Sequence, residues 1–193
     1  MTPLRTRLRS DTQYDHDRID ALYGRYDLTD RADLSAFLEA HALALSWCTD
    51  AIPADRSEFS ALMRGLIAAI GDDLAHLGAP AQSHWPAKPN ALRGDALGLI
   101  YVVAGSRLGG RVLVRQILAA EDPVVASATR YFTCTEGDAL WQSVQVALQD
   151  WTGSSDQEAR LVEGARSAFQ YYEDAHFAVQ GLQSRNDYEY RVA

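Results

Sequence analysis

Apolar residues recur with helical spacing along most of the chain. An α-helix returns to the same face every 3.6 residues, so positions at i, i+3 and i+4 share one side. Between residues 4 and 23, such a stripe consists of Leu4, Leu8, Thr12, His16, Ile19 and Tyr23. Similar spacing predicts further helices over residues 31–50, 57–77, about 122–132, 137–151 and 155–183.

Two segments lack this spacing. Residues 78–89, GAPAQSHWPAKP, contain three prolines, so we expect a connector there. Residues 184–193 are polar, which predicts a flexible tail.

The segment 90–120 is the longest apolar region and contains several glycines. Its centre, residues 100–103, could be a buried strand on propensity alone. We predict a helix instead, because the segment far exceeds the usual strand length and no partner strand is predicted elsewhere. The expected fold is therefore all-α: one domain over residues 1–193, with six to eight helices in a bundle.

Composition narrows the functional classes. The chain has 193 residues, 47% hydrophobic and 23% charged, which suits a single folded domain. The formal net charge of −8 argues against nucleic-acid partners and against anionic membranes. The N-terminus has no apolar run, and no stretch approaches the roughly 20 apolar residues of a membrane span. Cys48 and Cys134 are far apart, and we expect both to be free in the core. We therefore expect a soluble, cytoplasmic protein.

His16 is the first candidate for chemistry. It could be a core histidine bonded to a backbone carbonyl, or a histidine at the edge of the apolar stripe. It could also be an axial ligand, because a neutral imidazole on an apolar face can bind haem iron.

A ladder of glycines is the second candidate. Gly98, Gly105 and Gly109 are spaced by seven and four residues and share one helix face, with Gly110 adjoining them and Ser106 beside them. Each glycine in a helix interior costs about 1 kcal/mol relative to alanine. Either close helix packing or a flat ligand against bare backbone would offset this cost.

Other patterns in the sequence give weaker evidence for a functional site. Glu173 and His176 form one Glu-x-x-His pair, whereas a di-iron bundle site needs two, so we expect both to be surface polar residues. His41, His76 and His84 lack zinc-like spacing. The sequence has no Gly-x-Ser-x-Gly elbow, phosphate loop or dinucleotide fingerprint.

Together the two candidate sites resemble haem oxygenase, especially the short bacterial type that produces biliverdin. Residues 8–16, LRSDTQYDH, are similar to that family's proximal helix, with its Leu-x-x-x-Thr-x-x-x-His pattern. Residues 98–113, GLIYVVAGSRLGGRVL, are similar to its distal helix, with its Gly-x-x-x-Gly-Gly segment. The resemblance covers roughly residues 8–182.

The resemblance implies roles for these residues. His16 would be the proximal ligand of the haem iron, with Thr12 and Arg9 also at the haem. Gly105 and Gly109 would let the distal backbone approach the haem, and Gly110 would support the bend. Mammalian members have an aspartate at the position of Ser106, whereas a serine also occurs in bacterial members.

The implied reaction is cleavage of haem to biliverdin, carbon monoxide and ferrous iron. Haem would be both cofactor and substrate, with dioxygen and electrons from a ferredoxin- or reductase-type partner. Two alternatives remain: a haem-binding or sensory protein without turnover, and a haem-free relative of the thiaminase-like or di-iron branches of this fold.

Overall fold

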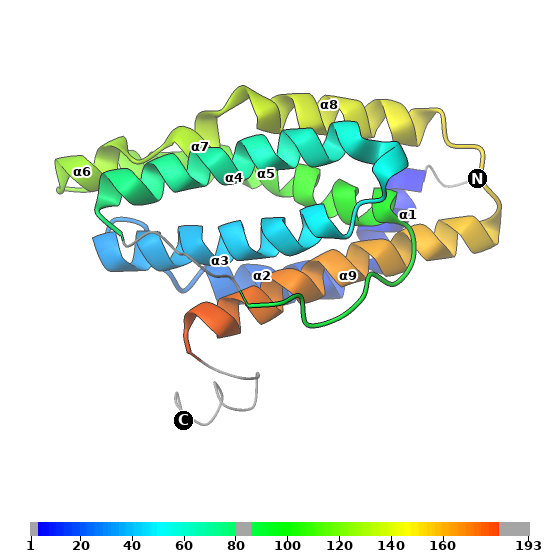
Figure 1. The fold of residues 1–193 in the computed structure, drawn as a ribbon, viewed down its shortest axis with the longest axis horizontal. Helices are drawn as coiled ribbons and strands as arrows, with labels where there is room; N and C mark the ends of the chain where they lie inside the picture. Colours follow the sequence, from blue (N-terminus) through cyan, green and yellow to red (C-terminus); the bar gives the residue numbers. More distant parts are fainter. Residues whose placement is uncertain (1–3, 80–85, 182–193) are drawn as a thin grey trace.

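The computed structural model describes residues 4–79 and 86–181 as an all-helical bundle (Figure 1). In these residues it has nine α-helices and one short 3-10 helix, η1. Their bounds are α1 Leu4–Asp11, α2 Gln13–Tyr23, α3 Arg31–Asp50, η1 Ala54–Arg56, α4 Ser57–Leu77, α5 Ala96–Leu118, α6 Pro123–Ser127, α7 Arg130–Thr133, α8 Thr135–Gln149 and α9 Ser155–Val179. The predicted all-α class is confirmed. The predicted tail 184–193 and His84 lie outside the described residues, as does part of the connector.

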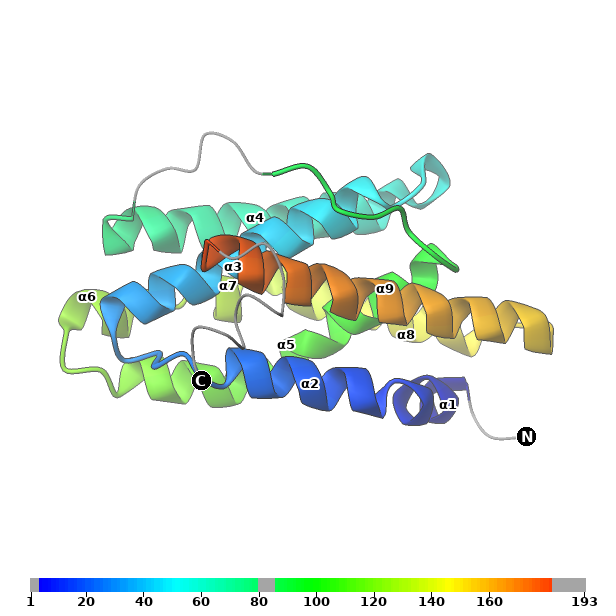
Figure 2. The same cartoon turned by 90° about the horizontal axis from the view of Figure 1, so that it is seen from below.

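The prediction of one helix over residues 4–23 is wrong. The chain breaks at Thr12, whose φ of −116° and ψ of 8° depart from helical values. The Thr12 hydroxyl donates to the Leu8 carbonyl (2.7 Å), which closes the end of α1. Figure 2 shows α1 nearly end-on and α2 lengthwise. The break changes the direction of the helical stripe just before His16.

The predicted helix over 122–132 is likewise two helices, α6 and α7. The Asp122 carboxylate caps α6 by accepting from the Val124 amide (2.9 Å), and Ala128 then leaves helical geometry with ψ of 71°. These two breaks raise the number of helices above the six to eight expected.

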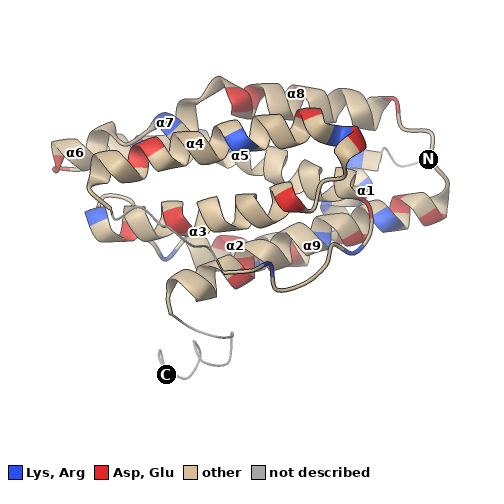
Figure 3. Ribbon diagram, in the orientation of Figure 1, with Lys and Arg blue, Asp and Glu red and all other residues tan. Residues whose placement is uncertain are grey.

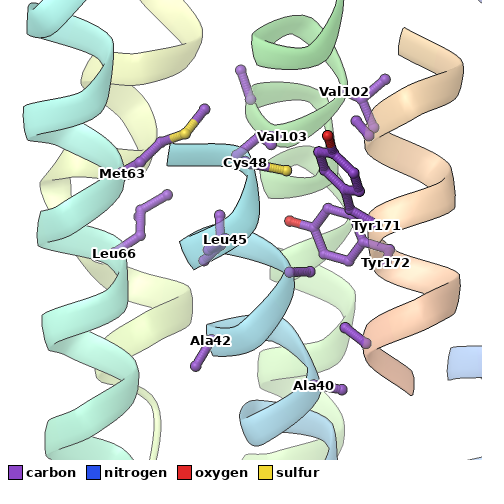
Figure 4. Packing of buried hydrophobic residues seen from close by; sticks show 14 of the residues in the cluster. Ala40, Ala42, Leu45, Cys48, Met63, Leu66, Val102, Val103, Tyr171 and Tyr172 are labelled. Carbon is purple, nitrogen blue, oxygen red and sulfur yellow. The ribbon is translucent and has the colours of Figure 1, made fainter. Parts of the chain in front are cut away.

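The core forms around α3, which packs against both α4 and α9. Figure 4 shows side chains of α3 such as Leu45 and Cys48 between Met63 of α4 and Tyr172 of α9. Leu45, Cys48 and Met63 are fully buried. Each such aliphatic side chain contributes about 1.5–3 kcal/mol to stability by leaving water. Cys48 is therefore the buried free thiol that was predicted, whereas Cys134 is only half-buried.

The glycine-containing segment forms α5, as predicted, and starts at an N-cap in which the Asp95 carboxylate accepts from the Leu97 amide (2.8 Å). The helix bends by 45° between Ala96–Gly110 and Val112–Leu118. In the described residues no single helix is long and apolar enough to cross a membrane, and only this bent pair passes such a test, by length and composition alone.

The last helix, α9, connects the two candidate regions because it packs against α1, α2, α3 and α5. It begins with a capping box, in which the Gln157 side chain accepts from the Ser154 amide (2.8 Å). Acidic and basic positions are interspersed along α3, α4 and α9 (Figure 3). The packing of α2 and α5 on α9 therefore positions the candidate site residues.

Candidate haem site

His16 lies on α2 at the edge of the apolar face, with 55% of its side chain exposed. Its ring meets the ring of Phe169 on α9 edge to face, with centroids 6.1 Å apart and an angle of 76°. It is therefore not a core histidine, which was one of the interpretations of the sequence. One side of the imidazole rests on α9 and the other side is accessible.

Asp20 is the carboxylate nearest to this imidazole. Its Oδ2 lies 3.2 Å from Nδ1 of His16, one helical turn earlier, while Asp17 is more distant at 3.9 Å. A carboxylate that accepts from Nδ1 holds the proton on that nitrogen and leaves the lone pair of Nε2 for a metal. Asp20 was not predicted from the sequence, although it follows His16 by four residues and both therefore lie on one helix face.

The glycine ladder on α5 divides into two parts with different environments. A Cβ at Gly98 would overlap the carbonyl oxygen of Leu161, so Gly98 permits close packing of α5 on α9. A Cβ at Gly105 or Gly109 would meet no atom within 4 Å. Packing therefore explains the first glycine, and the other two present bare backbone to open space.

Gly110 and Ser106 lie beside these glycines on α5. A Cβ at Gly110 would make ordinary contact with Phe132, at 3.6 Å. The hydroxyl of Ser106 is bonded to the Val103 carbonyl (2.8 Å), and the residue is exposed. Gly110 thus faces α7, and Ser106 remains near the open face with its proton directed to its own helix.

Two large apolar side chains flank the open glycines. Leu108 and Val112 are each 59% exposed, although they lie in the longest apolar helix of the chain. Exposed apolar side chains that cluster together mark a surface that another apolar group covers. The open face of α5 therefore suits a flat, apolar ligand.

A cationic edge lies near the N-terminus of the bundle. The Arg5 guanidinium lies 5.2 Å from the centre of the Trp141 ring. Burial raises the pKa of Tyr101, and the positive charges of Arg5 and Arg9 oppose this increase. Arg9 was predicted from the sequence, whereas Arg5 and Tyr101 were not. Tyr101 precedes Gly105 by one helical turn, so its place on the same face was readable from the spacing.

Thr12 was predicted to lie at the haem. The structure buries Thr12, with 3% of its surface exposed, and directs its hydroxyl to the Leu8 carbonyl. Its contact is with the chain itself, at the break that starts the helix carrying His16.

The prediction that Glu173 and His176 are surface residues is wrong. Glu173 is 5% exposed and lies 3.0 Å from the Arg18 guanidinium; His176 is 3% exposed, with Nδ1 2.9 Å from the Tyr26 hydroxyl. Sequence spacing could not reveal this, because both partners are about 150 residues away. Across residues 4–79 and 86–181, no three His, Cys, Asp or Glu side chains are grouped so that they could hold a metal ion.

A separate open groove lies at the other end of α5. Arg56, Leu97, Val146 and Trp151 are among the residues that line it. None of the predicted site residues is among them, so this groove is distinct from the face that carries Gly105 and Gly109.

Comparisons with known proteins show which proteins share this fold and part of this sequence. The solved structure of NO- and CO-bound haem oxygenase from Neisseria meningitidis superposes with a TM-score of 0.67, at 19% identity, over 96% of each chain. This likeness defines the class of the fold as that of haem oxygenase. The chain is also 33% identical over 110 residues to haem oxygenase from Xanthomonas campestris pv. campestris (strain 8004). That match spans 56% of this chain and 66% of the relative, just under two thirds of its length. No family model matches the chain. The chain is therefore similar in sequence to a haem oxygenase over part of its length, and its fold is that of the Neisseria meningitidis haem oxygenase.

Proposed function

We propose that the chain is a haem oxygenase that cleaves haem to biliverdin, carbon monoxide and ferrous iron. One observation carries the proposal: an accessible imidazole and a helix with two bare glycines both border α9. Figures 1 and 2 both place α2 and the middle of α5 next to α9, with α2 on the outer side of the bundle. We place the haem between these two helices.

His16 would bind the iron through Nε2. Asp20, 3.2 Å from Nδ1, would accept a hydrogen bond from it, fix the ring orientation and make the imidazole a stronger donor. Phe169 limits rotation of the ring from the other side. The residues present therefore fit a haem, with a single protein ligand on the proximal side.

The open face of α5 would cover the other side of the haem. Gly105 and Gly109 leave room for a ring and a small molecule such as dioxygen, because no atom fills the space that a Cβ would occupy. Leu108 and Val112 would lie against the apolar ring and exclude water from its edge. The Ser106 hydroxyl, beside this face, would hold a water molecule that supplies protons.

The carboxylates of haem would lie at the cationic edge. Arg5 and Arg9 supply two positive charges, and the Tyr101 hydroxyl supplies a hydrogen-bond donor. Charge-assisted hydrogen bonds to carboxylates are about twice as strong as neutral ones. This edge would therefore fix the in-plane orientation of the ring, and with it the position of cleavage.

When bound, the haem itself supplies the oxidative chemistry, using dioxygen and electrons from an external ferredoxin- or reductase-type partner. The test is to add one equivalent of hemin and then a reductant under air. We expect the Soret band to decay into the spectrum of biliverdin, with release of carbon monoxide. A stable Soret band under these conditions would instead indicate a haem-binding protein without turnover.

A further inference from the structure

Among the contacts of α2 and the loop after it with α9, four lie on one face of α9. The His16 ring meets Phe169, and the Tyr23 hydroxyl donates to the Tyr172 carbonyl (2.9 Å). The two remaining contacts are the ion pair Arg18–Glu173 (3.0 Å) and the hydrogen bond Tyr26–His176 (2.9 Å). The first of these contacts on α2, at His16, is also the first on α9, and the last, at Tyr26, is also the last on α9.

The ion pair is well buried, and Arg18 also lies 3.7 Å from Asp15 on its own helix, whose side chain is 18% exposed. The Glu173 side chain is 7% exposed and that of Arg18 is 25% exposed. By contrast, the pair Glu163–Arg166 on the same helix is nearly half exposed on both sides (46% and 47%). Water screens the exposed pair, whereas a buried carboxylate depends strongly on its partner.

The position of this pair connects it to the imidazole. Arg18 follows His16 by two residues on α2, and Glu173 follows Phe169 by one helical turn on α9. On α9, Phe169 and Glu173 share one face, so the two contacts are one helical turn apart there. A shift of α2 relative to α9 would change both contacts together.

We propose that Glu173 is a positioning residue: through Arg18 it holds α2 on α9 and so fixes where His16 presents its imidazole to the haem. The proposal rests on the proposed function only in taking His16 as the iron ligand. The position of the imidazole relative to Phe169 is a property of the haem-free protein and can be measured without haem.

The first test is therefore made on the haem-free protein. The NMR resonance of the His16 Cε1 proton reports the edge-to-face contact with Phe169 through the ring current. In Glu173→Gln, which keeps the shape and removes the charge, we expect this resonance to move toward the value of a solvated histidine. The matched control is Glu163→Gln, the same substitution in the exposed pair, which should leave the resonance in place.

The second test measures haem binding. We expect Glu173→Gln to raise the dissociation constant for hemin about tenfold, the scale typical of residues that orient a metal ligand. In the background His16→Gly with added imidazole, the ligand is no longer attached to α2. There the same Glu173→Gln change should have no effect on hemin affinity, whereas a purely structural role would weaken binding in both backgrounds.

Melting curves identify variants that fail to fold. If Glu173→Gln does not fold, Arg18→Gln removes the same contact from its more exposed side and takes its place in both tests. An unchanged His16 resonance, or equal loss of affinity in both backgrounds, would overturn the proposal. Failure of the wild type to bind hemin would contradict the proposed function, and the NMR test would still decide whether Glu173 positions His16.

Discussion

Oδ2 of Asp20 lies 3.2 Å from Nδ1 of His16, one turn earlier on the same helix. If His16 binds the haem iron, this contact would leave Nε2 as the ligating nitrogen and increase the electron density that the imidazole donates. The relationship gives the first testable prediction.

Asp20→Asn should lower the negative charge beside the imidazole while keeping its size. We expect the variant to bind hemin through His16, but with a higher ferric/ferrous midpoint potential and a lower iron–histidine stretching frequency in the resonance Raman spectrum. Asp17→Asn is the matched control, because Asp17 is 3.9 Å from the same nitrogen. If both variants shift these values equally, general charge rather than the Asp20 contact is responsible.

Gly109→Ala should separate folding from turnover. No atom lies within 4 Å of the added Cβ, so the fold should tolerate it and can gain up to about 1 kcal/mol of helix stability. The methyl group would occupy the space above the haem. We therefore expect hemin binding with a large loss of biliverdin formation, measured by a melting curve and product analysis on one sample. Wild-type biliverdin yield in the folded variant would show that Gly109 is not part of the distal site.

Gly98→Ala should instead destabilise the fold. Its Cβ would overlap the Leu161 carbonyl of α9, so α5 and α9 would have to separate. Overpacking of this kind costs about 1–3 kcal/mol, and urea unfolding should show a loss in this range. Gly105→Ala, which meets no atom, should show none of this loss and serves as its control.

Arg9→Gln should weaken hemin binding by removing one charge from the cationic edge. We expect a several-fold increase in the dissociation constant and a weaker dependence of affinity on salt, because fewer charges then attract the haem carboxylates. Arg64→Gln on α4, an exposed arginine outside this edge, is the control. Equal losses in the two variants would mean that Arg9 acts only through net charge.

Two buried histidines predict the effect of acid on stability. Burial lowers the pKa of both His41 and His176 from the ordinary 6.5 to about 4. The folded state therefore keeps these rings neutral below pH 6.5, where the unfolded chain takes up protons. The free energy of unfolding should fall as the pH drops from about 6.5 toward 4, by about 1.4 kcal/mol per pH unit for each histidine.

Urea unfolding at pH 7, 6 and 5 measures this dependence. His41→Gln should reduce the slope of stability against pH by the contribution of one histidine. The same slope in the variant and the wild type would show that folding does not lower the pKa of His41.

The all-α fold class could be predicted from the sequence, because helical spacing of apolar residues is a local property. It placed α3 and α4 at residues 31–50 and 57–77, as the structure has them, and predicted α5 as a helix despite its strand-like centre. It also singled out His16 and the glycines. These features depend on residues within a few turns of each other, which the sequence displays directly.

The contacts of each of these residues with distant helices could be known only from the three-dimensional structure. The same helix face carries Gly98 and Gly109, yet α9 crosses at the first and leaves the second open. Glu173 and His176 are buried because α2 and the loop after it pack on α9, about 150 residues away in the chain. Local spacing shows which residues share a helix face but not which distant helix covers that face, since this depends on how the whole bundle buries its apolar surface.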